Sequence, residues 1–138
     1  MILGSAKADG LRGGGGDDVL VGRGGKDILY GGAGQDTFRF EKLSDSLAAG
    51  SGRDYIGDFV RGEDKIDLHA IDADALTAAN EAFTWIGSDT FTKNAGELRI
   101  ASIAGGHQVQ ADINGDGKTD FAIDVMTKMT LHSSDFFL

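Results

Sequence analysis

Aspartate recurs at every ninth position in the first half of this 138-residue chain. The series comprises Asp9, Asp18, Asp27, Asp36, Asp45 and Asp54. Carboxylates are hard oxygen ligands, and a regular array of them suits Ca²⁺, which takes about six to eight oxygens at about 2.3–2.6 Å. Mg²⁺ is smaller and gives up water reluctantly, so it fits such an array poorly. The spacing therefore makes these aspartates candidate ligands for several calcium ions.

Glycine holds fixed positions in the same nine-residue unit. From residue 13 the chain reads GGGGDDVLV, GRGGKDILY and GGAGQDTFR, with Gly first and fourth, Asp sixth and an apolar residue eighth. Glycine accepts backbone angles that other residues avoid, so GGxGxD predicts a turn and the next three residues predict a short strand. Repeats of this kind build a parallel β-helix. The predicted inward residues are Leu11, Leu20, Leu29, Phe38, Leu47 and Ile56.

With two units in each turn of the helix, residues 18 apart should lie one above another, about 4.8 Å apart as in any sheet. The predicted stacked pairs are Asp9 with Asp27, Asp18 with Asp36, Asp27 with Asp45, and Asp36 with Asp54. Two carboxylates this close repel by roughly 1 kcal/mol in water and by more near a protein surface. A divalent cation would offset that repulsion. Backbone carbonyls of the turns should complete its coordination, at Gly14, Gly16, Arg23, Gly25, Gly32 and Gly34.

The overall charge excludes some classes of partner. The chain has 22 acidic and 13 basic residues and a formal net charge of −9, which argues against a nucleic acid or an anionic membrane surface. It has no cysteine, so disulfides and zinc–thiolate sites are excluded. No apolar run is long enough to insert into a membrane. Neither HExxH nor GxSxG is present, so we expect a non-catalytic domain.

A second acidic motif lies near the carboxyl end. Its residues follow the D-x-N-x-D-G-x-x-D spacing of calcium loops and are Asp112, Asn114, Asp116 and Asp120. One interpretation is a further Ca²⁺ site. The other is a hairpin turn in which Asn-Gly and Asp-Gly supply the backbone angles. The sequence leaves both open.

The pattern changes after the repeats, and we divide a single domain, 1–138, into repeats at 1–56 and an antiparallel β-sandwich at 57–138. Alternating apolar residues predict strands near 97–103, 107–113 and 120–126. Residues 72–82 predict one short helix, with Asp72 or Asp74 as its N-cap. Trp85 lies in an apolar run and is interpreted as core, with a ligand-stacking surface as the alternative. Tyr30 flanks an inward position, so we expect either the sandwich or an absent domain to cover it.

These motifs resemble the RTX family, and more narrowly the C-terminal domain of serralysin-like secreted metalloproteases. The supporting segments are the nonapeptides, DYIGDFVRGEDKIDLHAID at 54–72, FTWIG at 83–87, AGELRI at 95–100, NGDGKTDFAI at 114–123 and the ending DFFL. Alginate-epimerase modules and RTX lipases share the nonapeptides and the DF…DKIDL segment. The resemblance implies an all-β fold in which a parallel β-roll continues into an antiparallel β-sandwich.

The resemblance also implies a secreted, extracellular protein exported by type I (ABC) secretion machinery. That route uses an uncleaved C-terminal signal, for which the candidate residues are Asp135, Phe136, Phe137 and Leu138. The same ending could be a last strand docked on the core. We further expect an N-terminal catalytic domain, absent from this chain, as the attached partner.

Two hypotheses about function follow. In the first, the domain folds when Ca²⁺ binds outside the cell, which supports the secretion and stability of an attached enzyme, most simply a metalloprotease. In the second, it is a polysaccharide- or protein-binding module of a secreted RTX enzyme or adhesin. The first hypothesis predicts a fold that depends on calcium, whereas the second hypothesis predicts a basic groove with exposed aromatic rings.

Overall fold

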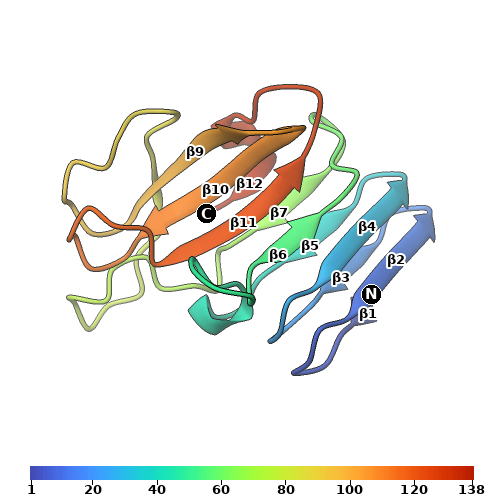
Figure 1. Ribbon diagram of the computed structural model, residues 1–138, viewed down its shortest axis with the longest axis horizontal. Helices are drawn as coiled ribbons and strands as arrows, with labels where there is room; N and C mark the ends of the chain where they lie inside the picture. The colour runs from blue at the N-terminus through green and yellow to red at the C-terminus, as the bar shows by residue number, and fades with distance from the viewer.

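Two facing β-sheets make up the protein in a computed structural model that describes residues 1–138 (Figure 1). One sheet has five strands in the order β1-β3-β5-β7-β12, and the other has seven in the order β2-β4-β6-β11-β10-β9-β8. The strands are β1 Ile2–Leu3, β2 Gly10–Gly15, β3 Val19–Val21, β4 Ile28–Ala33, β5 Thr37–Arg39, β6 Asp54–Ile56, β7 Lys65–Asp67, β8 Thr84–Trp85, β9 Glu97–Ile103, β10 Gly106–Asp112, β11 Phe121–Met126 and β12 Phe136–Phe137. Two short 3-10 helices are η1 Leu43–Asp45 and η2 Ser133–Asp135.

The first five strands form the predicted parallel roll. Successive strands alternate between the two sheets, so each sheet receives every second nine-residue unit. Leu11 is paired with Leu29 across β2 and β4, and Leu20 with Phe38 across β3 and β5. Both pairs are 18 residues apart, which confirms two units per turn. Leu20, Leu29 and Phe38 are completely buried, as expected for the inward position of each unit.

The nine-residue count is interrupted between β5 and β6. Residues 41–53 leave the roll, and Leu47, predicted to point inward, is 46% exposed. Buried Ser46 fixes this excursion, because its hydroxyl donates to the Ala122 carbonyl and accepts the N–H of Asp54. The roll then resumes with longer steps. β4 pairs with β6 at a separation of 27 residues, and β5 pairs with β7 at a separation of 28.

The second half extends both sheets of the roll. β11 joins β6 in parallel, and β11, β10 and β9 then run antiparallel, as predicted for the sandwich. At the outer edges β8 is parallel to β9, and β12 is parallel to β7. A single core of 20 buried residues runs through the roll and the added strands. Trp85 is partly buried and packs against this core, in agreement with the core interpretation.

The prediction of a helix at 72–82 is wrong. This segment forms turns, and residues 75–80 are all exposed. The Asp72 carboxylate accepts the N–H groups of Asp74 and Glu81, and the Asp74 carboxylate accepts that of Leu76. Aspartate side chains that take backbone N–H groups compete with helical hydrogen bonds. The exposed alanines also offer no apolar face to pack. No helix of the protein has the length and apolar character needed to cross a membrane.

Tyr30 is half-buried, and neighbouring parts of the same sheet cover it. The Arg12 guanidinium lies 4.4 Å from the centre of its ring. Gly57, which follows β6, lies against the ring so closely that any larger residue there would collide with it. Thus the segment after β6 covers Tyr30, whereas Ile28 on the same strand remains 44% exposed.

The inward position of the roll gives a direct test of this packing. We expect Leu29→Ala to lower the free energy of unfolding by about 2–5 kcal/mol, because it removes a fully buried side chain at the centre of a parallel strand. The matched control is Leu76→Ala, at a residue that is 69% exposed, and it should change stability by no more than about 0.5 kcal/mol. Urea unfolding of both variants in Ca²⁺, followed by circular dichroism, measures the difference. Equal losses would contradict the assigned inward face.

Candidate metal centre

Aspartates at the sixth position of each unit reach across to the neighbouring turn. One oxygen of Asp27, Oδ1, accepts the backbone N–H of Asp9 at 2.8 Å. In the same way, Asp36 Oδ1 accepts the N–H of Asp18 at 2.9 Å. Both bonds join residues 18 apart, so the predicted stacking of Asp9 with Asp27 and of Asp18 with Asp36 is confirmed. These bonds run along the axis of the roll and tie its turns together.

Further along the roll, the partners differ from the prediction. Asp54 stacks on Asp27, whose N–H donates to Asp54 Oδ1 at 2.8 Å. Asp64 stacks on Asp36, whose N–H donates to Asp64 Oδ1 at 3.0 Å. The predicted partners, Asp45 for Asp27 and Asp54 for Asp36, were wrong because residues 41–53 leave the roll. The sequence does hold a signal for the missed residue, since Asp64 precedes Ile66 with the same Asp-x-apolar spacing as the other repeats.

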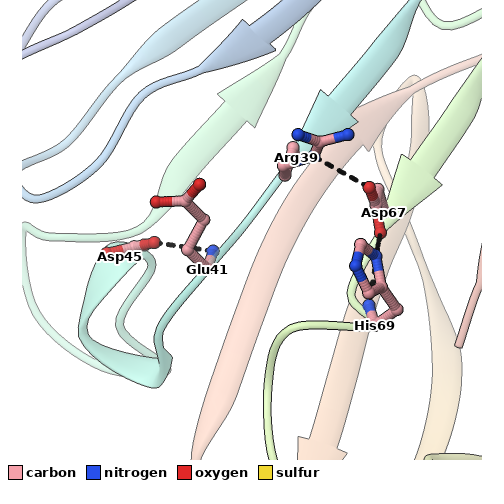
Figure 2. Close-up of polar contacts among 5 residues, drawn as sticks. All are labelled: Arg39, Glu41, Asp45, Asp67 and His69. Atoms are coloured by element: carbon pink, nitrogen blue, oxygen red, sulfur yellow. Dashed lines mark hydrogen bonds and ion pairs between the residues drawn. The ribbon is translucent and has the colours of Figure 1, made fainter.

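Asp45 has a local role at the start of that excursion. Its carboxylate accepts the backbone N–H of Glu41 at 2.9 Å (Figure 2). It also accepts that of Lys42 at 3.0 Å, and together these bonds hold the turn of η1. Burial is the main cause of the raised pKa values of Asp27 and Asp54, and repulsion from the Asp45 carboxylate adds to it, so Asp45 remains close to these two stacked aspartates. Asp45 thus contributes negative charge to the row without being stacked in it.

The second oxygen of three stacked aspartates is buried without a hydrogen-bond partner. These atoms are Oδ2 of Asp27, Asp36 and Asp54. The three residues are at most 1% exposed. A buried, unpaired carboxylate oxygen is costly unless a positive charge or a donor meets it. Orphaned oxygens of this kind, repeated from turn to turn, fit a row of bound cations.

Burial also changes the acidity of the row. Loss of solvent raises the pKa values of Asp27, Asp36 and Asp64 above the ordinary value, and repulsion from neighbouring carboxylates adds to the effect. For Asp54 the same causes raise the pKa to about 8. The protein therefore provides too little positive charge for these groups.

The turn residues predicted to offer carbonyls share one backbone conformation. All have positive φ, between 71° and 131°: Gly14, Gly16, Arg23, Gly25, Gly32 and Gly34. A side chain at Gly32 would collide with the carbonyl oxygen of Gly14, which places that oxygen against the next turn of the roll. Arg23 is the exception to glycine in this set, and its guanidinium donates to the Gly4 carbonyl at 3.3 Å. The carbonyl oxygens of Gly14 and Gly16 thus lie where neighbouring turns meet.

Asp58 is a further acidic residue at the end of the roll. Its carboxylate accepts the N–H groups of Gly31 at 2.9 Å and Gly32 at 3.0 Å. Its charge also raises the pKa values of Asp36 and Asp64. Asp36, Asp58 and Asp64 therefore form one group, which we call the terminal acid cluster. The nine-residue spacing gives no indication of Asp58, because this residue lies outside the repeat phase.

The second acidic motif folds as a compact loop between β10 and β11. Carboxylate oxygens of Asp112, Asp116 and Asp120 lie within 4.8 Å of one another, as the calcium interpretation requires. The buried Asp112 carboxylate also accepts the N–H groups of residues 114, 115 and 117, and Asp120 accepts that of residue 113. Gly115 and Gly117 have positive φ. These latter features are those of the turn interpretation, so the loop meets the geometric requirement of both.

One carboxylate outside the rows is already paired. Asp67 accepts from the Arg39 guanidinium at 2.9 Å and from the His69 ring on its other oxygen (Figure 2). Burial acts to raise the pKa of Asp67, but the hydrogen bonds from His69 and Arg39 outweigh it and lower the pKa. Asp67 is as buried as the stacked aspartates, but its counter-charge lies within the protein. The stacked aspartates lack such a counter-charge.

The four residues of the predicted secretion signal comprise the last residue of η2, the two residues of β12 and the final Leu138. Asp135 and Phe136 are buried, Phe137 is 48% exposed, and Phe136 and Phe137 form β12 beside β7. The alternative interpretation of the ending, as a strand docked on the core, is therefore confirmed for Phe136.

Known proteins resemble the chain in sequence and in structure. Residues 7–138 match the family described as Peptidase M10 serralysin C terminal. The metalloprotease AprA of Pseudomonas entomophila (strain L48) is 39% identical over 89 residues, which covers 63% of this chain and 17% of that protein. The AlgE6R3 subunit of the Azotobacter vinelandii mannuronan C5-epimerase has the same fold, with a TM-score of 0.53, 23% identity and coverage of 97% of this chain and 80% of its own. The AlgE6R2 subunit gives a TM-score of 0.51 at 26% identity, with coverage of 98% and 90%.

The acidity of the row predicts how stability without metal depends on pH. In the unfolded chain Asp54 has its ordinary pKa of 3.8, whereas the folded chain holds its proton up to about pH 8. The folded state therefore binds more protons in this window, and its stability should decrease as pH rises from about 4 to 8. Far-UV circular dichroism in metal-free buffer should therefore show more β structure at pH 5 than at pH 8, since each unit of pKa shift corresponds to about 1.4 kcal/mol of stability.

Asp54→Asn provides the control for this experiment, because it removes the titrating group with the highest pKa in the row. The dependence on pH should become smaller in this variant. Stability that is unchanged or greater at pH 8 in the unaltered chain would contradict the assignment of buried, unpaired carboxylates.

Proposed function

The chain belongs to the serralysin C-terminal family of M10 peptidases, and from this premise we propose that it is the calcium-binding, non-catalytic module of a secreted enzyme, which folds when Ca²⁺ binds outside the cell. The observation that carries the proposal is that carboxylate oxygens of Asp27, Asp36 and Asp54 are buried without a partner in the protein. Asp27 and Asp54 belong to one stack of aspartates in the roll, and Asp36 belongs to the other. The paired Asp67 nearby supports the same argument, since there the chain supplies its own cation, Arg39, together with a hydrogen bond from the His69 ring.

Calcium would supply the missing positive charge between neighbouring turns. The chain's contribution is to hold carboxylates and carbonyls in place for it. The proposed side-chain ligands are the stacked aspartates of the roll, Asp64 included, together with Asp58, which the nine-residue spacing did not indicate. The proposed carbonyl ligands are those of the positive-φ turn residues. Because these groups meet only when the turns stack, no site exists in the unfolded chain, and the free energy of binding becomes free energy of folding.

Because the calcium concentration differs across the cell envelope, this coupling would let the chain fold only after export. Where Ca²⁺ is scarce, repulsion within the row opposes folding and keeps the chain extended, as a narrow export channel requires. Extracellular calcium modules have weak dissociation constants, about 10⁻⁴–10⁻³ M, which suit binding outside the cell. We propose that this supports export by a type I secretion system and stabilises an attached domain after export.

The attached domain is proposed to be a metalloprotease. The named relative is a metalloprotease, and this chain matches only 17% of its length. The present sequence contains no HExxH motif, so the chemistry would lie in another part of such a protein. The role left to this chain is structural.

The alternative function, polysaccharide binding, would need basic and aromatic side chains gathered in one groove. Two such pairs exist, Arg12 over Tyr30 and Arg99 over Phe91. Arg12 is on β2 and Arg99 is on β9, and these strands are separated by four others in the seven-stranded sheet. The pairs are therefore too far apart to form one groove, and this observation favours the calcium proposal.

A calcium titration tests the proposal. Far-UV circular dichroism should show a gain of β structure as Ca²⁺ is added to the metal-free chain, and a chelator should reverse it. We expect Asp36→Asn to raise the calcium midpoint by about tenfold or more, because Asp36 is stacked with both Asp18 and Asp64 and each tenfold change is about 1.4 kcal/mol. Asp89→Asn, an exposed aspartate outside the rows, is the matched control and should leave the midpoint unchanged. A chelated chain with its full β signal would refute the proposal.

A further inference from the structure

The carboxyl-terminal strand β12 is hydrogen-bonded to a single neighbouring strand. β12 is the edge strand of the five-stranded sheet and pairs only with β7, through Phe136 with Ile66 and Phe137 with Asp67. The N–H of Leu68 donates to the Phe137 carbonyl at 2.9 Å. The position of β12 therefore depends on the position of the segment that contains β7.

Side chains of that same segment also bind the residues just before β12. The Arg61 guanidinium lies 3.6 Å from the buried carboxylate of Asp135 and 3.1 Å from the ring nitrogen Nδ1 of His132. The Lys65 ammonium donates to the Ser134 carbonyl. Arg61 and Lys65 thus fasten the carboxyl-terminal residues to the segment 60–65.

The segment 60–65 is also part of the roll through Asp64. Asp64 Oδ1 accepts the N–H of Asp36 at 3.0 Å, and its Oδ2 accepts the N–H of Val60 at 2.8 Å. Asp64 is 2% exposed and takes part in none of the four salt bridges of the protein. This short segment therefore carries both a carboxylate of the terminal acid cluster that has no salt-bridge partner and the two cations that hold the chain end.

We infer that the segment 60–65 couples ion binding in the last turn of the roll to the docking of β12. When a cation neutralises the terminal acid cluster, Asp64 stays against Asp36, and Arg61 and Lys65 are held in reach of Asp135 and Ser134. When the cluster is bare, repulsion between Asp64, Asp36 and Asp58 displaces the segment and weakens the docking of β12. The inference rests on the proposed function, because it requires that the cluster binds calcium.

The coupling has a consequence for the ending itself. Residues 135–138 are the predicted secretion signal, and in the docked state Asp135 and Phe136 are 1% and 6% exposed. Asp135 and Phe136 would be accessible in the calcium-poor cell interior and covered once the last turn of the roll is filled. The terminal acid cluster would thus control the accessibility of the signal, more directly than acids at the other end of the roll.

The chain carries its own reporter for this docking. Trp85 is its single tryptophan, and its ring lies 5.1 Å from that of Phe136, centre to centre. Quenching of Trp85 fluorescence by acrylamide therefore measures whether β12 is in place, whereas far-UV circular dichroism measures the roll as a whole.

The experiment compares two acids of the same row at saturating Ca²⁺. Asp64→Asn removes a carboxylate from the terminal acid cluster, and Asp18→Asn removes one from the opposite end of the row. Both should raise the calcium midpoint seen by circular dichroism. At saturation, only Asp64→Asn should leave Trp85 more accessible to acrylamide, by about twofold or more, as expected for a coupling lost at one site. Equal accessibility of Trp85 in the two variants would overturn the inference.

Arg61→Gln separates docking from ion binding, because it leaves every carboxylate in place. We expect its circular dichroism midpoint to match the unaltered chain, while the Trp85 transition requires about fivefold more Ca²⁺ or more. Arg12→Gln, which alters an arginine on the far strand β2, is the matched control and should change neither transition. A Trp85 transition in Arg61→Gln that superimposes on that of the unaltered chain would refute the coupling.

Hydrogen exchange of residues 131–138 at saturating Ca²⁺ gives a second measure that does not depend on fluorescence. Faster exchange in Asp64→Asn than in Asp18→Asn supports the inference, and equal exchange contradicts it. If the unaltered chain shows no circular dichroism response to calcium, the proposed function itself fails. A calcium response without the difference between the two variants defeats the coupling alone.

Discussion

The structure depends on the stacked aspartate carboxylates, because one oxygen of each bond between turns stabilises the roll while the second oxygen opposes its folding. In Asp27, Asp36, Asp54 and Asp64 one oxygen accepts a backbone N–H from the neighbouring turn, which ties the roll together. That bond brings the second oxygen into a buried position where, at Asp27, Asp36 and Asp54, no donor meets it. The contact that orders the roll therefore also concentrates negative charge inside it. In a chain with a net charge of −9, the balance between these effects is set by whatever cation is available.

Glycine makes this arrangement possible at the turns. Positive φ at alternate turn positions lets carbonyl oxygens lie directly against the next turn, and a side chain at Gly32 or Gly34 would collide with the backbone one turn earlier. Only apolar residues at the eighth position of each unit are left to fill the narrow interior. The roll alone thus has a thin core. Its extension by β9–β12 gives the protein one continuous core and stops the solenoid at one end (Figure 1).

The repeats and the sandwich share two strands at the point where the two halves of the chain meet. β6 and β7 are the last strands of the roll, and they are also the strands on which β11 and β12 pair. Acids of the roll and cations that hold the chain end therefore occupy the same short stretch. A change in the charge of the roll acts on the sandwich through these strands, since no flexible linker separates the two.

The sequence by itself determined the parallel roll, its inward residues other than Leu47 and the first two stacked pairs of aspartates, because a strict nine-residue period fixes which residues share a side of a solenoid. It failed where distant contacts override local spacing. Ser46 is fixed by Ala122 of β11, and this contact moves residues 41–53 out of the roll, exchanges Asp45 for Asp54 and brings in Asp64. At 72–82, side-chain hydrogen bonds to backbone N–H groups outweighed helix propensity. Only the tertiary structure placed Asp58 beside the row and Arg61 beside Asp135, because neither contact follows from any period in the chain.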